Sequence, residues 1–242
     1  MTELPFRTLP FRYRFLRSLF YLGFRLFTRL EVRGLERLPV SGPYIFVTNH
    51  LHLLDAPLMF ALLGQRDATG FVGSTHRTNL FYRLAADWVG GIWLHRGEPD
   101  REALSAALDA LKQGRILGIA PEGTRSQTRA LGPGKEGVAF LVARSRAPLY
   151  PVALTHTDRV FSAWKRLRRP LVRVVVGERF DLTAVEVPDR SQRLVVWTDE
   201  IMCRIAALLP AEYRGVYADH PRLKDLTAVS SQGRNSRSSA QV

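Results

Sequence analysis

A histidine and an aspartate at the end of an apolar run have the residue types needed for proton transfer. The segment Thr48-Asn49-His50-Leu51-His52-Leu53-Leu54-Asp55 places His50 and Asp55 five positions apart. In a straight α-helix this spacing separates two side chains by roughly 140°, so we expect a strand end followed by a helix start. Asp55 could then accept a hydrogen bond from one ring nitrogen, leaving the other as a general base with a defined tautomer.

The nucleophile for such a base would be a hydroxyl group on the substrate. The chain contains no Gly-x-Ser-x-Gly segment, which disfavours a covalent serine hydrolase. His50 and Asp55 correspond to the histidine and aspartate of a serine protease without its serine. The histidine would then take the proton of a hydroxyl on the substrate. This chemistry suits acyl transfer to an alcohol.

Two further segments could hold a charged substrate. In Gly90-Gly91-Ile92-Trp93-Leu94-His95-Arg96, apolar residues lead to an arginine, whose planar guanidinium matches two phosphate oxygens. In Ile119-Ala120-Pro121-Glu122-Gly123-Thr124-Arg125-Ser126, Pro121 ends a strand, and the polar turn after it contains a glycine that permits close backbone approach to a ligand.

These segments, in this order, resemble signature blocks of the glycerolipid acyltransferase family, whose members acylate lysophosphatidic acid and related lysophospholipids. A fourth segment, Ala147–Leu154, resembles the family's apolar, proline-bearing block that lines the acyl-chain or acceptor site. Its prolines favour an edge or irregular strand, although it could equally be plain core. The likeness extends from about Glu31 to Tyr217.

The resemblance implies a role for each matched residue. It makes His50 the general base, polarised by Asp55, and Arg96 the anchor of the acceptor's phosphate. The acceptor would also be bound by the third block, at Glu122, Gly123, Thr124 and Arg125. The chain departs from the family's usual residues at His52, His95 and Ala120.

The activity implied is transfer of a fatty acyl group from acyl-CoA or acyl carrier protein to 1-acyl-glycerol-3-phosphate, forming phosphatidic acid in phospholipid biosynthesis. No metal and no cofactor beyond the donor's carrier is expected. Three alternatives stay open: another lysolipid acceptor, a non-catalytic basic membrane-binding protein, and a metal site at His50, His52 and Asp55.

Composition restricts the partners and the compartment. The formal net charge is +13 and the pI is about 10.8, which favours polyanionic partners such as membrane phospholipid. No zinc-finger spacing or aromatic RNA-binding signature is present, so nucleic acid is not expected. The single cysteine, Cys203, cannot form an internal disulfide, which suits a reducing compartment, and core is its expected role.

Residues 1–30 interleave arginines with aromatic and aliphatic residues. Their longest uncharged run, Ser18 to Phe24, is far shorter than the roughly 20 apolar residues that span a bilayer. This pattern predicts an amphipathic helix that binds the cytoplasmic face of a membrane, peripherally or monotopically. The alternative is an ordinary amphipathic helix packed on its own domain.

The expected fold is α/β, a single domain with a mixed, partly parallel sheet flanked by helices. The acyltransferase domain is predicted over residues 31–220 and a polar, disordered tail over residues 221–242. Strands are expected at Pro43–Val47, Gly70–Gly73, Arg115–Ala120, Leu149–Leu154 and Leu171–Val176. Helices are expected at Arg101–Gln113, Glu136–Arg144 and Ser191–Leu209.

Overall fold

The computed structural model describes residues 9–64, 66–95, 100–187 and 189–228. These residues form a seven-stranded sheet with strand order β1-β7-β6-β2-β5-β3-β4. Neighbouring strands are parallel except for β6 and β7, which confirms the predicted mixed α/β sheet. The strands are β1 (Arg29–Arg33), β2 (Tyr44–Thr48), β3 (Ala68–Gly73), β4 (Ile92–Leu94), β5 (Ile116–Ile119), β6 (Leu149–Thr155) and β7 (Leu171–Val176).

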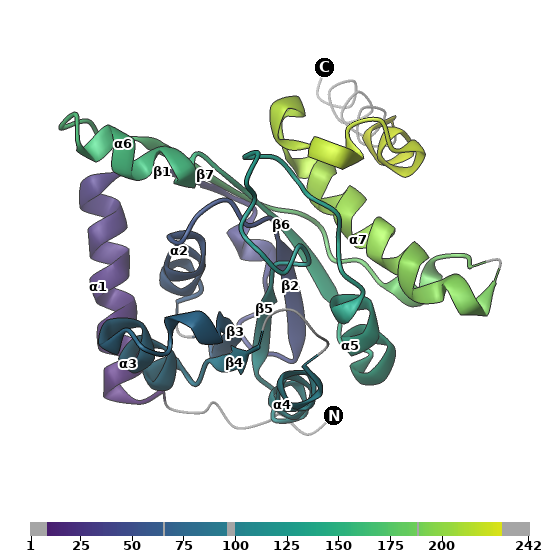
Figure 1. Ribbon diagram of the computed structural model, residues 1–242, viewed down its shortest axis with the longest axis horizontal. Coiled ribbons are helices and arrows are strands. Elements are labelled where there is room, and N and C mark those ends of the chain that lie inside the picture. The colour runs from purple at the N-terminus through teal and green to yellow at the C-terminus, as the bar shows by residue number, and fades with distance from the viewer. Residues whose placement is uncertain (1–8, 65, 96–99, 188, 229–242) are drawn as a thin grey trace, which may run out of the picture.

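Helices cover both faces of this sheet (Figure 1). They are α1 (Phe11–Phe27), α2 (Asp55–Leu62), α3 (Leu80–Val89), α4 (Arg101–Lys112), α5 (Gly137–Ser145), α6 (Val160–Trp164) and α7 (Arg193–Leu208). Strand β2 is buried along its whole length and alternates between two hydrophobic cores. Ile45 and Val47 enter the core with α4, α5 and α7, whereas Tyr44 and Phe46 enter the core with α1 and α2.

The three helices predicted from periodicity, at α4, α5 and α7, are confirmed to within two residues at each end. Several elements were not predicted from the sequence pattern. Strand β4 has three residues, and β1 carries charged side chains at an edge of the sheet. Helix α3 begins after Asn79, whose side chain accepts hydrogen bonds from the amides of Phe81 and Tyr82.

The described part of the N-terminal segment contains a helix that ends earlier than predicted, and residues 1–8 of the prediction lie outside the described residues. Helix α1 stops at Phe27, because the Thr28 hydroxyl donates to the Phe24 carbonyl and Arg29 already belongs to β1. No helix among the described residues combines the length and apolar character needed to cross a bilayer.

Of the placements expected for the fourth block, which were an edge or irregular strand and plain core, the structure shows a core strand. Strand β6 lies between β7 and β2 and is buried throughout. Pro151 is tolerated because the ladder to β7 runs from Val152 to Thr155 and is interrupted before an isolated bridge at Leu149. The proline nitrogen therefore lies where the strand pairing is broken.

The start of the predicted tail also differs from expectation. Residues 221–228 are helical, Leu223 is buried, and Leu226 packs against the same core. These two apolar residues lie three positions apart on one side of the segment, and Arg222 forms an ion pair with Glu200 of α7. Residues 229–242, the rest of the predicted disordered tail, lie outside the described part of the chain.

Candidate active site

The corner between β2 and α2 brings His50 and Asp55 together. His50 Nδ1 lies 2.8 Å from Asp55 Oδ2, because β2 ends at Thr48 and α2 begins at Asp55 itself. The same carboxylate oxygen accepts the backbone N–H groups of Leu51 and His52, each at 2.7 Å. The oxygen that faces Nδ1 already accepts two amides, so Nδ1 is the donor of the ring and Nε2 is left for a substrate proton.

The His50 side chain is 23% exposed, whereas the Asp55 side chain is 4% exposed. The second carboxylate oxygen of Asp55, Oδ1, is buried without a hydrogen-bond partner in the described structure. A buried carboxylate with one unpartnered oxygen interacts more strongly with the ring once the ring becomes positively charged. This geometry therefore suits a pair in which the carboxylate stabilises a protonated imidazole.

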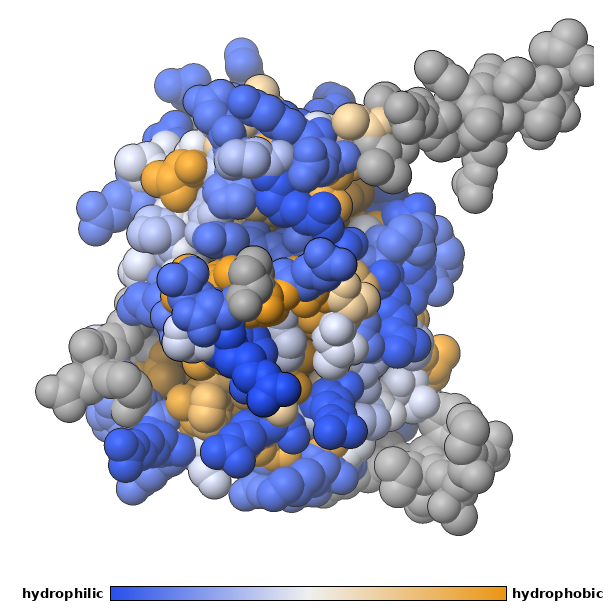
Figure 2. Space-filling view, turned by 90° about the vertical axis from the view of Figure 1, so that its right-hand side faces the viewer, coloured by the Kyte–Doolittle hydropathy of each residue, from blue (hydrophilic) through white to orange (hydrophobic). Residues whose placement is uncertain are grey.

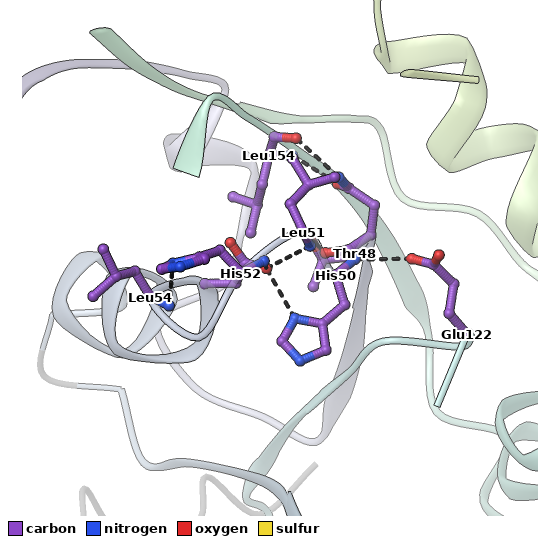
Figure 3. Close-up of polar contacts among 9 residues, drawn as sticks. Thr48, His50, Leu51, His52, Leu54, Glu122 and Leu154 are labelled. Atoms are coloured by element: carbon purple, nitrogen blue, oxygen red, sulfur yellow. Dashed lines mark hydrogen bonds and ion pairs between the residues drawn. The ribbon is translucent and has the colours of Figure 1, made fainter. Parts of the chain in front are cut away.

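The loop after β5 fixes the backbone of His50 at both its amide and its carbonyl, and Figure 3 shows the contact of Glu122 with the amide. Glu122 Oε1 accepts the His50 amide at 2.9 Å, and the Ser126 amide donates to the His50 carbonyl at 2.7 Å. Glu122 Oε2 accepts the Gly132 amide at 2.9 Å. Both oxygens of this carboxylate are thus bonded to backbone amides, so the geometry gives Glu122 a positioning role where the resemblance implied contact with the acceptor.

Burial raises the pKa of Glu122, and the hydrogen bonds from the Gly132 and His50 amides oppose that rise. The residue is 5% exposed. Two neutral amide donors offset the cost of burying an ionised carboxylate less than the positive charge of an arginine would. The His50 peptide is consequently held by a carboxylate that carries a net burial penalty.

Asn49, which sequence reasoning did not select, ties the same corner to the sheet. Its side-chain amide donates to the Leu154 carbonyl at 2.9 Å, and its side-chain oxygen accepts the Leu154 amide at 2.8 Å. Asn49 therefore extends the hydrogen bonding between β2 and β6 by one residue. A polar residue directly after a buried strand is the sequence signal that could have identified it.

A cavity of about 310 Å³ opens beside the histidine and is lined mainly by apolar side chains. Its polar end contains Thr48, His50, Asp55 and Arg125. The apolar part draws on several elements, including Leu16 and Phe20 of α1, Phe46 of β2, Phe60 of α2, and Phe81 and Tyr82 of α3. An apolar cavity with a base at its polar end suits a lipid whose reacting group is polar.

Glycines keep the strands below this cavity close together. A Cβ on Gly118 would lie 2.3 Å from the Phe46 ring, and one on Gly70 would lie 2.9 Å from the Gly118 carbonyl oxygen. Gly123 has φ +67°, and the Lys135 side chain passes about 3.1 Å from where its Cβ would stand. A side chain at Gly123 would thus be strained and would displace Lys135.

The predicted substrate-binding residues are distributed unevenly. Gly123 and Arg125 line the cavity, whereas Thr124 is exposed and is not part of its wall. Arg96 lies outside the described residues, although Leu94 of the same block lines the cavity. The fourth block, expected to line the acyl-chain or acceptor site, is absent from the wall and instead supports Asn49.

His52 points away from a shared site with His50. Its ring packs edge-to-face on Phe161 with 5.0 Å between centroids, and burial lowers its pKa. Within the described residues, no group of three or more His, Cys, Asp or Glu side chains is arranged to hold a metal ion. The interpretation of His50, His52 and Asp55 as a metal site therefore gains no support.

Residues 29–155, slightly more than half of the chain, match the model of the Acyltransferase family. The chain belongs to the acyltransferase family. The matched range contains β1 to β6 and every residue described above at the polar end of the cavity.

Individual acyltransferases are similar over part of their length. The chloroplastic 1-acyl-sn-glycerol-3-phosphate acyltransferase BAT2 of Brassica napus is 28% identical over 178 residues, which cover 68% of this chain and 50% of the relative. The mouse 1-acyl-sn-glycerol-3-phosphate acyltransferase alpha is 29% identical over 144 residues, covering 57% and 49%. The chain thus spans about half the length of the curated relatives it matches.

The fold is shared with a solved acyltransferase structure. The crystal structure of PlsC, the 1-acyl-sn-glycerophosphate acyltransferase of Thermotoga maritima, superimposes with a TM-score of 0.61 at 22% identity. The likeness covers 76% of this chain and 74% of that one. At this identity the comparison establishes the fold of this family member.

Proposed function

We propose that this acyltransferase moves a fatty acyl group from an acyl thioester to the free hydroxyl of 1-acyl-glycerol-3-phosphate, forming phosphatidic acid. The observation that carries the proposal is the His50–Asp55 pair at the polar end of an apolar cavity. The names of the Brassica and mouse relatives, both 1-acyl-sn-glycerol-3-phosphate acyltransferases, support the choice of acceptor.

The reaction proceeds by direct attack of the acceptor. His50 Nε2 takes the proton of the acceptor hydroxyl while the oxygen attacks the thioester carbonyl. Asp55 stabilises the positively charged ring through Nδ1, at 2.8 Å. The C–S bond then breaks as the new ester forms, and the ring proton passes to the departing thiolate.

Positive side chains near the base bind the acceptor's phosphate. Arg125 lines the cavity beside His50, and Arg96 keeps this role as a prediction from its block. Glu122 acts through the His50 peptide, which it holds at 2.9 Å. The donor is acyl-CoA or acyl carrier protein, and the reaction draws on no metal.

The lipid substrates reach the cavity from the cytoplasmic face of a membrane on which α1 lies. One side of α1 packs on the domain through Tyr13, Leu16 and Phe24. The other side exposes an apolar stripe at four- and three-residue spacing, consisting of Phe11, Phe15, Leu19, Leu22 and Leu26, each between 51% and 80% exposed. Arginines flank this stripe, which suits insertion at the acyl boundary of an anionic surface.

The test is acyl transfer from labelled acyl-CoA and acyl carrier protein to lysophosphatidic acid, with other lysolipids measured in parallel. We expect turnover with lysophosphatidic acid, and a rise of about tenfold or more in its KM for Arg125→Ala. Arg179→Ala, an exposed arginine outside the cavity wall, is the control and should leave KM unchanged.

If the wild type prefers a lysolipid without a terminal phosphate, the proposed acceptor is wrong but acyl transfer remains the reaction. A wild type that shows no turnover with any combination of acyl donor and lysolipid acceptor would favour a non-catalytic membrane-binding protein. Deleting α1 is a poor test of membrane binding, because Leu16 and Phe20 form part of the cavity wall.

A further inference from the structure

The turn that follows α6 exposes a leucine among cations. Its sequence is Lys165-Arg166-Leu167-Arg168-Arg169, and every residue in it is exposed. Leu167 is 97% exposed, the largest value among the exposed apolar residues of the described chain. No feature of the active site accounts for this turn.

The backbone makes the leucine more unusual. The Arg168 amide donates to the Ala163 carbonyl at 3.0 Å and the Leu167 amide to the Trp164 carbonyl at 2.9 Å, which is the Schellman pattern that ends a helix. Leu167 occupies its left-handed position with φ 54°, where glycine is the usual residue. A leucine there is strained and gains almost no burial within the chain, so its benefit must come from an external contact.

The turn is fixed rigidly to the end of α1. Trp164 Nε1 donates to the Phe27 carbonyl at 2.7 Å, and the two rings pack edge-to-face. Arg169 donates to the Arg25 and Thr28 carbonyls at 2.7 and 2.8 Å. The turn therefore projects beside the C-terminal end of α1, at the left of Figure 1.

We propose that the Lys165–Arg169 turn is a second membrane anchor, which inserts Leu167 into an anionic bilayer. Lys165, Arg166 and Arg168 contact lipid phosphates, while Arg169 remains bonded to α1. The proposal rests on the membrane association proposed for α1 and adds a lipid-selective contact to it. The turn lies beside the end of α1 at which Leu26 and Phe27 are each 56% exposed, which favours a bilayer over an acidic protein such as the acyl carrier.

The opposite side of the molecule has a different surface. Hydrophilic residues predominate on the face turned toward the viewer in Figure 2. Val216, near the C-terminal end of the described chain, is 66% exposed and supplies a matched control for an exposed apolar side chain.

The experiment measures co-sedimentation of the full chain with vesicles of phosphatidylcholine alone or mixed with phosphatidylglycerol. Leu167→Gly should bind mixed vesicles about tenfold more weakly, because one buried leucine is lost from the bilayer. Its Tm should rise, because glycine relieves the left-handed strain. Val216→Ser should bind like the wild type.

The charge contribution is tested by Lys165→Gln/Arg166→Gln/Arg168→Gln, which should lose most of the preference for mixed vesicles. Unchanged vesicle binding by both turn variants would overturn the proposal. In that case the α1 double variant Leu19→Asp/Leu22→Asp decides between two outcomes. If it binds vesicles more weakly than the wild type, α1 is the anchor. If it binds as the wild type does, the proposed membrane association is overturned too. A rise in KM for acyl carrier protein with intact vesicle binding would instead identify the turn as a carrier-docking surface and overturn the lipid contact.

Discussion

Two corners of this protein contain the same types of side chain in different surroundings. The active-site corner holds His50, Asp55 and Glu122, and the C-terminal corner holds His220, Asp199 and Glu200. In the first corner the ring lies 2.8 Å from the carboxylate, and in the second it lies 4.0 Å away. Residue type therefore does not distinguish the two corners.

The difference lies in the backbone and the cavity. Asp55 is fixed by two amides and faces a cavity, whereas His220 Nδ1 lies 3.2 Å from the buried sulfur of Cys203. Burial raises the pKa of the Cys203 thiol to about 12, so it stays protonated and unreactive. A histidine beside a carboxylate becomes a useful base only where its second nitrogen opens on a space for substrate.

The two buried glutamates differ in the same way. Among the described residues, the donors to the Glu122 carboxylate are the backbone amides of His50 and Gly132, and burial raises its pKa. Burial would also raise the pKa of Glu200, but ion pairs with Arg222 at 2.5 Å and Arg204 at 2.6 Å outweigh it and the pKa is lowered. Glu122 positions the peptide of His50, whereas Glu200 joins residues 221–228 to α7.

The largest contrast between the corners should be in turnover. His50→Ala removes the base and should lower kcat by about a thousandfold, since general-base catalysis contributes roughly 10² to 10⁴. His220→Ala should leave kcat within about twofold, because that ring serves packing. Steady-state acyl transfer measures both, and comparable losses in the two variants would remove the distinction between the corners.

Glu122→Gln sharpens the contrast between positioning and substrate binding. Glutamine offers one acceptor oxygen to two amides, so one amide is left unsatisfied, and kcat should fall about tenfold. Acceptor KM should change less than threefold, and Glu122→Asp should recover part of kcat. A large rise in KM at constant kcat would instead show direct contact with the acceptor.

Glu200→Gln should affect stability alone. It leaves two arginines without their buried partner and should lower the free energy of unfolding by about 3 kcal/mol. Denaturant unfolding monitored by circular dichroism measures this change, and kcat per folded molecule should equal that of the wild type. A stability like that of the wild type would mean that the ion pairs contribute nothing net.

The smallest effect is the dependence of stability on pH, for which the two glutamates have opposite signs. Relative to Glu122→Gln, the wild type should lose stability as the pH rises above 4.5 through the raised pKa of Glu122, because the native state binds more protons there. Relative to Glu200→Gln, the wild type should lose stability as the pH falls below 4.5 through the lowered pKa. Unfolding curves between about pH 3 and pH 7 measure how each difference in free energy of unfolding depends on pH. Slopes of the same sign for the two glutamates would show that the direction given for one of the two pKa shifts is wrong.

Much of the fold could be predicted because it depends on local patterns. Apolar runs bounded by Gly and Pro marked β2, β5 and β6, and three- and four-residue spacing marked α4 and α7. The strand-turn-helix arrangement of His50 and Asp55 also followed from their spacing. The choice between a sheet edge and the core for β6 could not be made from the sequence, because it depends on where the ladder to β7 is interrupted.

The supporting shell of the site was harder to predict. Glu122 and Ser126 bind the backbone of His50, and amide partners leave no pattern in the sequence of either segment. The contribution of Leu16 and Phe20 to the cavity depends on how α1 packs on the sheet. Such contacts are set by tertiary packing between segments far apart in the chain.

The central claim is that His50 and Asp55 act as one catalytic unit, and a double-mutant cycle tests it most directly. We expect Asp55→Asn to lower kcat about a hundredfold, and the variant with both Asp55→Asn and His50→Ala to be no less active than His50→Ala alone. That result would mean that Asp55 works entirely through the ring. Multiplicative losses in the double variant would contradict the account, because they would assign the two side chains independent roles.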